Sequence, residues 1–142
     1  MIDGSKVDLE KYPMMRWRWK AVTLPSGADA RVKEKDDQGL AVYAGYGRVK
    51  QTSVSYNWQT VTPKQTSGHA VYNSLVNVDW FTLRNQEDKM DIWYEEEVNL
   101  KDDMVKFFKK IPSDWAISIS SNSQYTKSKA EVYLDYIEFV EK

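Results

Sequence analysis

Three carboxylates, Asp91, Glu95 and Glu97, share one face of a segment whose alternating side chains predict a strand. Two carboxylic acids at a suitable separation can hydrolyse a glycosidic bond, one as the acid and the other as the nucleophile or base. These residues are therefore the candidate catalytic groups of a small glycan hydrolase or lyase. The alternative, which we favour, is a charged outer face that is matched to cations on a neighbouring strand.

A second group of residues combines aromatic rings with side-chain amides. Sugar-binding sites use this mixture, because a ring stacks on the apolar face of a pyranose and an amide hydrogen-bonds to neighbouring hydroxyls. The candidate sugar-binding residues on two adjacent predicted strands are Tyr43, Tyr46, Tyr56, Asn57, Trp58 and Gln59. The alternative is a strand with one inward-facing side and one exposed polar side.

Cations alternate with large apolar side chains along residues 15–21. This period of two predicts a half-buried strand with Trp17 and Trp19 on one face. The opposite face then presents Arg16 and Arg18, which can hold the carboxylates or sulfates of an acidic glycan. We favour the simpler interpretation, in which the rings fill the core and the cations pair with acidic neighbours.

One possible ligand set for a structural calcium ion consists of Asp135, in the last predicted strand, with Asp36 or Asp37. Calcium takes about six to eight oxygen ligands, so these residues would supply only part of the site. No other cofactor is expected, because the chain has no cysteine and its single histidine, His69, has no neighbouring metal ligand. Residues 44–47 contain glycines but lack the lysine and following helix of a phosphate-binding loop.

The composition limits the classes of partner. The chain has 142 residues, a net charge of -1 and 42% hydrophobic residues, which is typical of a globular domain. The balanced charge predicts no general attraction to nucleic acid or to an anionic membrane. No apolar run is long enough to span a membrane, and residues 1–4 do not begin a signal peptide.

The predicted elements indicate an all-β fold. About seven or eight strands follow one another with turns between them and only one short helix, which favours an antiparallel β-sandwich of the jelly-roll or galactose-binding-like type. Residues 1–142 are expected to form a single domain. Within it, residues 1–11 are expected to be a frayed lead-in.

The one predicted helix precedes Pro112, which would end it. Asp102 or Asp103 is expected to cap its N-terminus. Val105 and Phe108 are expected to form its apolar stripe.

Several motifs together resemble the bacterial domain-of-unknown-function 3047 family. Residues 12–20 carry the Pro-x-x-x-Trp-x-Trp pattern of its opening strand, and residues 24–29 carry the Leu-Pro-x-Gly-Ala-Asp turn that follows. The Asp-Asp pair at 36–37, the Trp-x-Glu-Glu-x-x-Asn run at 93–99 and the strand at 130–139 are also similar. The last of these resembles the final strand of many jelly-roll carbohydrate-binding modules.

The resemblance implies a jelly-roll-like sandwich and an exported protein, periplasmic or secreted. The chain departs from the family pattern at residues 120–123, which are Ser-Ser-Asn-Ser where an acidic Asp-x-Asp run is usual. Family members also usually carry a signal peptide and further strands upstream, so this chain is expected to lack upstream strands.

These observations favour a non-catalytic module that binds an extracellular or cell-wall polysaccharide. Aromatic and amide residues are present in suitable patterns, whereas no complete catalytic constellation is. A small glycan hydrolase or lyase is the first alternative. The second is a protein-interaction or assembly subunit, in which a sheet edge left open by absent upstream strands accepts a strand from a partner.

Overall fold

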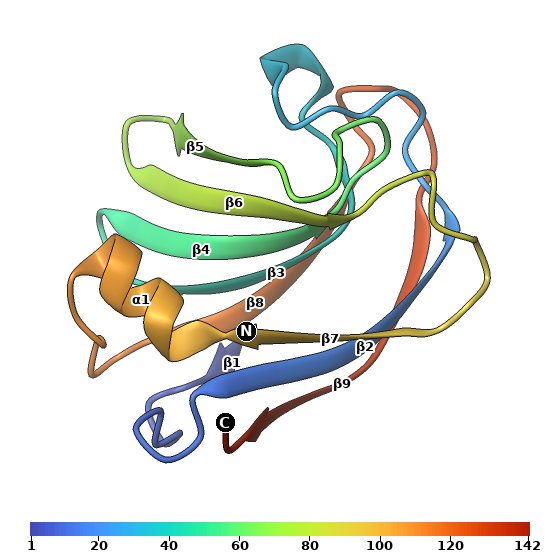
Figure 1. The fold of residues 1–142 in the computed structure, drawn as a ribbon. Coiled ribbons are helices and arrows are strands. Elements are labelled where there is room, and N and C mark those ends of the chain that lie inside the picture. The colour runs from blue at the N-terminus through green and yellow to red at the C-terminus, as the bar shows by residue number, and fades with distance from the viewer.

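Nine strands arranged in two sheets form the framework of the molecule (Figure 1). The computed structural model describes residues 1–142. The strands are β1 (Ile2–Asp3), β2 (Met14–Thr23), β3 (Gln38–Tyr46), β4 (Gln51–Trp58), β5 (Ser67–Tyr72), β6 (Val76–Arg84), β7 (Tyr94–Asn99), β8 (Ala116–Asn122) and β9 (Glu131–Val140). The all-β sandwich expected from the sequence is confirmed.

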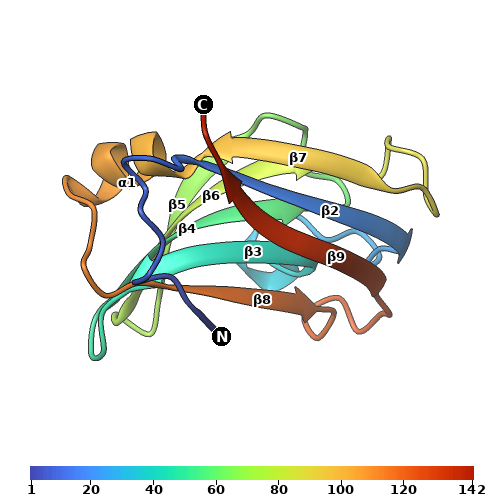
Figure 2. The ribbon, with the colours of Figure 1, turned by 90° about the horizontal axis from the view of Figure 1, so that it is seen from below.

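The larger sheet has six strands in the order β1-β8-β3-β4-β6-β5, and the smaller has three in the order β7-β2-β9. Strands β4 and β6 pair in parallel because the chain first visits β5 at the sheet edge and then returns. All other neighbours are antiparallel. Figure 2 shows the three-stranded sheet lying across one face of the larger sheet.

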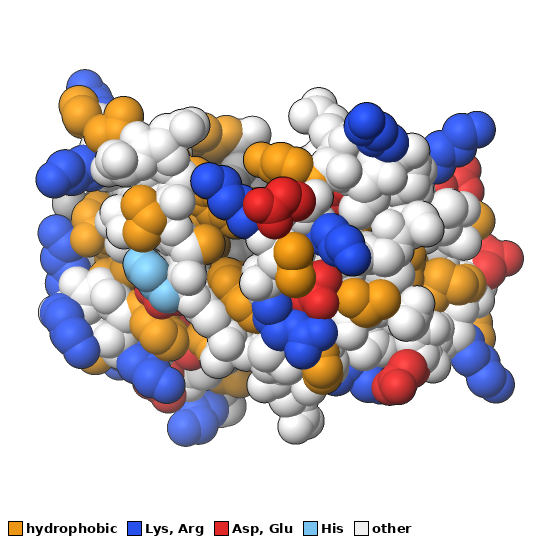
Figure 3. All heavy atoms as spheres, turned by 90° about the horizontal axis from the view of Figure 1, so that it is seen from above, with side chains coloured by type: hydrophobic (Ala, Val, Ile, Leu, Met, Phe, Trp, Pro, Cys, Tyr) orange, Lys and Arg blue, Asp and Glu red, His pale blue; other side chains and the backbone are white.

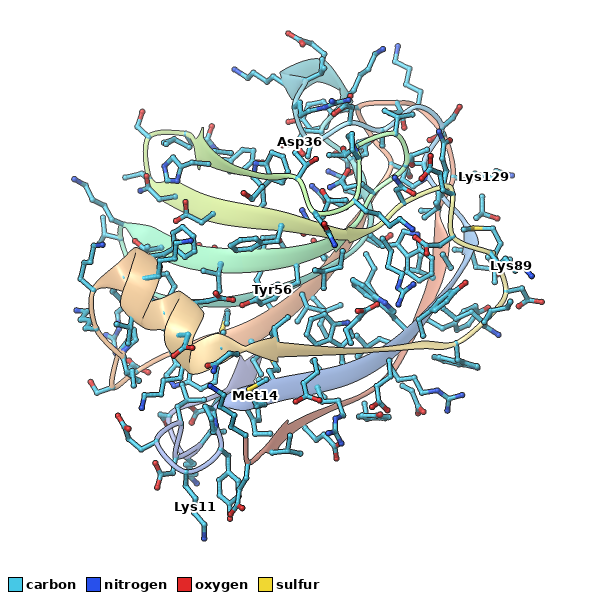
Figure 4. All side chains as sticks on the ribbon, in the orientation of Figure 1. Lys11, Met14, Asp36, Tyr56, Lys89 and Lys129 are labelled. Carbon is cyan, nitrogen blue, oxygen red and sulfur yellow. The ribbon has the colours of Figure 1, made fainter.

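The core between the sheets is built on the alternation of β2. Met15, Trp17 and Trp19 point inward and are fully buried. The Trp17 ring lies 5.6 Å from that of Tyr56, and the Trp19 ring lies 5.5 Å from that of Trp58. Figure 4 shows Tyr56 reaching from β4 into the space between the sheets. The interpretation of the tryptophans as core residues is therefore confirmed.

The single α-helix, α1 (Leu100–Phe108), covers one end of the sandwich. It begins earlier than predicted, because the Asn99 side chain accepts a hydrogen bond from the Asp102 backbone and so replaces Asp102 or Asp103 as the cap. The inward stripe consequently consists of Leu100, Met104 and Phe108, spaced four apart. Val105 is 47% exposed, so the expectation that it forms part of the stripe is wrong. The helix has neither the length nor the apolar character needed to cross a membrane.

Residues 1–11 belong to the fold and are not a frayed lead-in. Ile2 and Asp3 pair with Ile117 and Ala116 of β8, and Leu9 is 3% exposed within the core cluster. Sparse apolar residues in this segment gave no periodic signal, yet one of them is enough to anchor it.

The loop between β2 and β3 is fixed by the side chain of Asp29. Its carboxylate accepts hydrogen bonds from the Arg31 guanidinium at 2.8 and 2.9 Å and from the Thr62 hydroxyl at 3.3 Å. The guanidinium of Arg31 lowers the pKa of Asp29 to about 2. The loop also includes the short 3-10 helix η1 (Lys33–Lys35).

We expect the Asp29 ion pair to make stability depend on pH. The pKa of Asp29 is lower in the folded than in the unfolded chain, so the ionised form stabilises the fold above about pH 4 and this contribution is lost as the pH falls to about 2. Since Arg31 is half-exposed, solvent screens the pair, and Asp29→Asn should lower the free energy of unfolding by about 1 kcal/mol at pH 7. Urea unfolding should show this difference shrinking at pH 2.5. An Asp91→Asn control should show no comparable loss at either pH, and a pH-independent loss in Asp29→Asn would contradict the assignment.

Candidate functional site

The outer face of the three-stranded sheet carries a ladder of matched charges. Arg16 lies within 3.5 Å of Glu95, 3.2 Å of Glu97 and 3.3 Å of Glu138. Arg18 pairs with Asp135 at 3.5 Å. These cations and carboxylates come from neighbouring strands in register, so the geometry matches the favoured interpretation of a paired, solvated surface.

The candidate catalytic carboxylates also lie on this charged surface. Glu95 and Glu97 share Arg16 as their partner, and Asp91, in the loop before β7, pairs with Lys20 at 3.3 Å. All three are exposed, with 53%, 40% and 73% of the respective side chains open to solvent. None of the three lines the groove on the six-stranded sheet or the hollow beside Thr23 and residues 123–131.

The aromatic and amide residues at the end of β4, and Gln59 immediately after it, are closed to ligands. Tyr56 and Trp58 are 1% and 0% exposed because their strand lies at the centre of the larger sheet and faces the core. Asn57 and Gln59, on the opposite side, are 3% and 0% exposed next to residues 60–62, which hydrogen-bond to the β2–β3 loop. We therefore remove these four residues from the candidate site.

The aspartates considered for calcium are not gathered in one place. Asp135 lies on the charged outer face, whereas Asp37 is fully buried and accepts hydrogen bonds from Tyr125 and Thr126. Asp36 lies at the η1 end of the molecule (Figure 4) and accepts a hydrogen bond from the Tyr72 hydroxyl. No group of three or more acidic, histidine or cysteine side chains in the structure could hold a metal ion.

A groove of about 500 Å³ lies on the outer face of the six-stranded sheet. Five strands contribute to it, from β8 through β3, β4 and β6 to β5. Its lining includes the tyrosines and hydroxyl side chains Tyr43, Tyr46, Tyr72, Ser53, Thr52, Ser118 and Ser120. Of the sequence candidates, it therefore retains Tyr43 and Tyr46.

The groove is hollow because the smallest side chains stand side by side across the sheet. Gly45 of β3 faces Ser53 of β4 on one side and Ala116 of β8 on the other. A Cβ atom at Gly45 would lie 2.6 Å from the Ser53 Cβ and 2.7 Å from the Thr52 carbonyl oxygen. Glycine is therefore required here by the close approach of the two strands.

Two tyrosines also line the groove, Tyr43 from β3 and Tyr72 from β5. Tyr43 of β3 is half-buried, and burial raises the pKa of its hydroxyl, while hydrogen bonds to Ser120 and Ser55 act in the opposite direction. Tyr72 of edge strand β5 donates to Asp36, and burial together with this carboxylate raises its pKa. Burial also raises the pKa of Asp36. The Tyr72 ring is therefore held in place by its hydroxyl contact, and both tyrosines remain neutral.

A family model described as a protein of unknown function (DUF3047) matches residues 1–138. The chain belongs to this family. The family suspected from the sequence is thereby confirmed. No curated protein and no solved structure matches the chain.

The motifs that marked the DUF3047 resemblance hold the fold together. Trp17 and Trp19 fill the core, Asp29 fixes the β2–β3 loop, Glu96 accepts from the Trp19 indole at 3.2 Å, and Asn99 caps the helix. None of these residues lines the groove.

Sequence reasoning missed most of the groove residues. Ser118, Ser120 and Tyr72 were not candidates, although the alternation of Ser118 and Ser120 with Ile117 was a usable signal of a polar outer face on β8. Their convergence with Gly45 and Ser53 depends on strand pairing that the alternation alone does not give.

Proposed function

We propose that this member of DUF3047 is a non-catalytic carbohydrate-binding module and that the groove on its six-stranded sheet receives the sugar. The observation that carries the proposal is the composition of that groove, in which three tyrosines stand among hydroxyl-bearing, small and apolar side chains. Its volume of about 500 Å³ is within the range of small-molecule sites, roughly 300 to 1,000 Å³.

The chemistry of the lining suits a saccharide. Tyr43 and Tyr72 offer ring surface for the apolar face of a sugar, and Ser53, Ser118 and Gln51 offer donors and acceptors for its hydroxyls. These groups stand on strands rather than on loops. Binding would therefore require little ordering of the protein, which favours affinity.

We prefer binding to hydrolysis because of where the carboxylates lie. A glycosidase of the usual kind needs two carboxyl groups flanking the scissile bond. The groove lining contains one, Asp114, whereas Asp91, Glu95 and Glu97 are paired with cations on the other sheet.

Blocking the groove should abolish polysaccharide binding. Ser118 is half-buried and directly opposite Tyr43, so Ser118→Trp would place an indole over the floor. We expect at least one polymer of a neutral and acidic polysaccharide panel to retard the wild-type protein in affinity electrophoresis, and Ser118→Trp to bind it at least tenfold more weakly. A smaller change, Ser120→Gln, should weaken binding in the same direction.

The matched control is Ser121→Trp, an exposed position on the same strand that does not line the groove. It should bind as the wild type does, and urea unfolding should show that all three variants are folded. Absence of retardation by every polymer would overturn the proposal, as would equal binding by Ser118→Trp and Ser121→Trp.

A further inference from the structure

One end of the groove is formed by the turn between β3 and β4, and this turn is basic. Arg48 lines the groove together with Tyr46 and Gly47, and Lys50 follows in the same turn. The only carboxylate of the lining is Asp114. This end of the groove therefore carries more positive than negative charge.

The C-terminal end of α1 brings two further cations close to the β3–β4 turn, although they do not line the groove. The Tyr46 ring packs against the Phe108 ring at 5.1 Å, which holds the end of the helix against the β3–β4 turn. Lys110 then lies with its ammonium group 4.9 Å from the centre of the Tyr46 ring, and Lys109 precedes it. Figure 3 shows Lys and Arg side chains along this left edge of the molecule.

These cations differ from those on the outer face of the three-stranded sheet. There Arg16, Arg18 and Lys20 each have a carboxylate partner. None of the ion pairs in the structure includes the residues of the basic end, which are Arg48, Lys50, Lys109 and Lys110. Arg48 is the one of these four that lines the groove, and Lys109 donates to the Lys106 carbonyl oxygen at 3.0 Å. The charge of Arg48 is therefore available to an anion in the groove.

We infer that the ligand of the groove is an anionic polysaccharide whose carboxylate or sulfate groups meet the basic end. This inference rests on the proposed function and adds the class of sugar. The guanidinium of Arg48 can hold such a group through two parallel hydrogen bonds, and Lys50 in the same turn adds a second positive charge. The neutral remainder of the sugar lies over the serines and against the tyrosines of the lining.

The inference is tested with polymers that differ only in charge. Polygalacturonate, alginate and xanthan are each compared with their methyl-esterified forms, which keep the sugar backbone and lose the carboxylates. We expect at least one acidic polymer to bind at least tenfold more tightly than its ester, and this difference to shrink between 20 and 300 mM NaCl, because salt screens exposed charges. Ser118→Trp should weaken this binding, which places it in the groove.

Two substitutions that each remove one positive charge distinguish binding at the basic end of the groove from a general attraction between the protein and polyanions. Arg48→Ala should weaken binding of the acidic polymer at least fivefold and leave the ester unaffected. Lys89→Ala, at the opposite end of the molecule (Figure 4), removes the same net charge and should change neither.

Four results would overturn the inference. If every acidic polymer and its ester bind equally tightly, the protein still binds carbohydrate, but its ligand is not specifically an anionic polysaccharide. Equal losses in Arg48→Ala and Lys89→Ala, or binding of single-stranded DNA as tightly as of the acidic glycan, would indicate a general polyanion surface. If no polymer binds, whether acidic or esterified, the proposed function itself is wrong.

Discussion

Trp17→Ala is expected to lower the free energy of unfolding by about 3 to 5 kcal/mol, the usual cost of deleting a large buried aromatic side chain. Trp17 is fully buried and its ring contacts those of Trp19 at 5.4 Å and Tyr56 at 5.6 Å. The variant would leave a cavity where the two sheets meet. Because the indole N–H of Trp17 has no hydrogen-bond partner, the loss would come from packing alone.

The control for this prediction is another tryptophan in a different setting. Trp93 lies on the outer face, where Arg18 stands 4.9 Å and Lys20 5.1 Å from its ring centre. Trp93→Ala should cost about 1 kcal/mol or less, since exposed cation–ring contacts are weak. Urea unfolding monitored by circular dichroism would measure both. Similar losses in the two variants would show that Trp17 is not the centre of the core.

The alternation along β2 is strong enough for the sequence to predict the sandwich. Large rings at every second position and cations between them leave a single orientation for the strand, since a slip by one residue would bury Arg16 and Arg18 and expose the tryptophans. The same logic predicted β4 and β9, whereas β3 was predicted from an apolar run bounded by glycines. It failed where few apolar residues occur, as in β1, which is held by pairing with Ile117, and at the start of α1, where Asn99 supplies the cap.

The groove could not be predicted in the same way. Its floor depends on Gly45, Ser53 and Ala116 being neighbours, and β3 and β8 are separated in sequence by about half of the chain. Alternation states which side chains share a face of one strand, but it does not state which strands are adjacent. Nor does it show that a polar face is covered, as it is at Asn57 and Gln59.

The largest polar contribution to stability is expected from Asp37. This carboxylate is fully buried and accepts from the Thr126 backbone N–H at 2.7 Å, the Thr126 hydroxyl at 2.8 Å and the Tyr125 backbone N–H at 3.2 Å. It thereby attaches the loop between β8 and β9 to the beginning of β3. Asp37→Ala would leave these donors without a partner, and hydrogen bonds to a charged group contribute about 1.5 to 3 kcal/mol.

We therefore expect Asp37→Ala to lower the free energy of unfolding by about 3 kcal/mol and to expose residues 122–129 to proteolysis. Thr126→Val, which removes only the hydroxyl, should cost about 1 kcal/mol. Asp135→Ala is the matched control, because this aspartate pairs with Arg18 on the exposed face, where such pairs contribute about 1 kcal/mol or less. Equal losses at Asp37 and Asp135, or an unchanged cleavage rate in the loop, would contradict the role assigned to Asp37. The expected difference follows from burial, because a carboxylate removed from water depends on its protein partners far more than one that water still reaches.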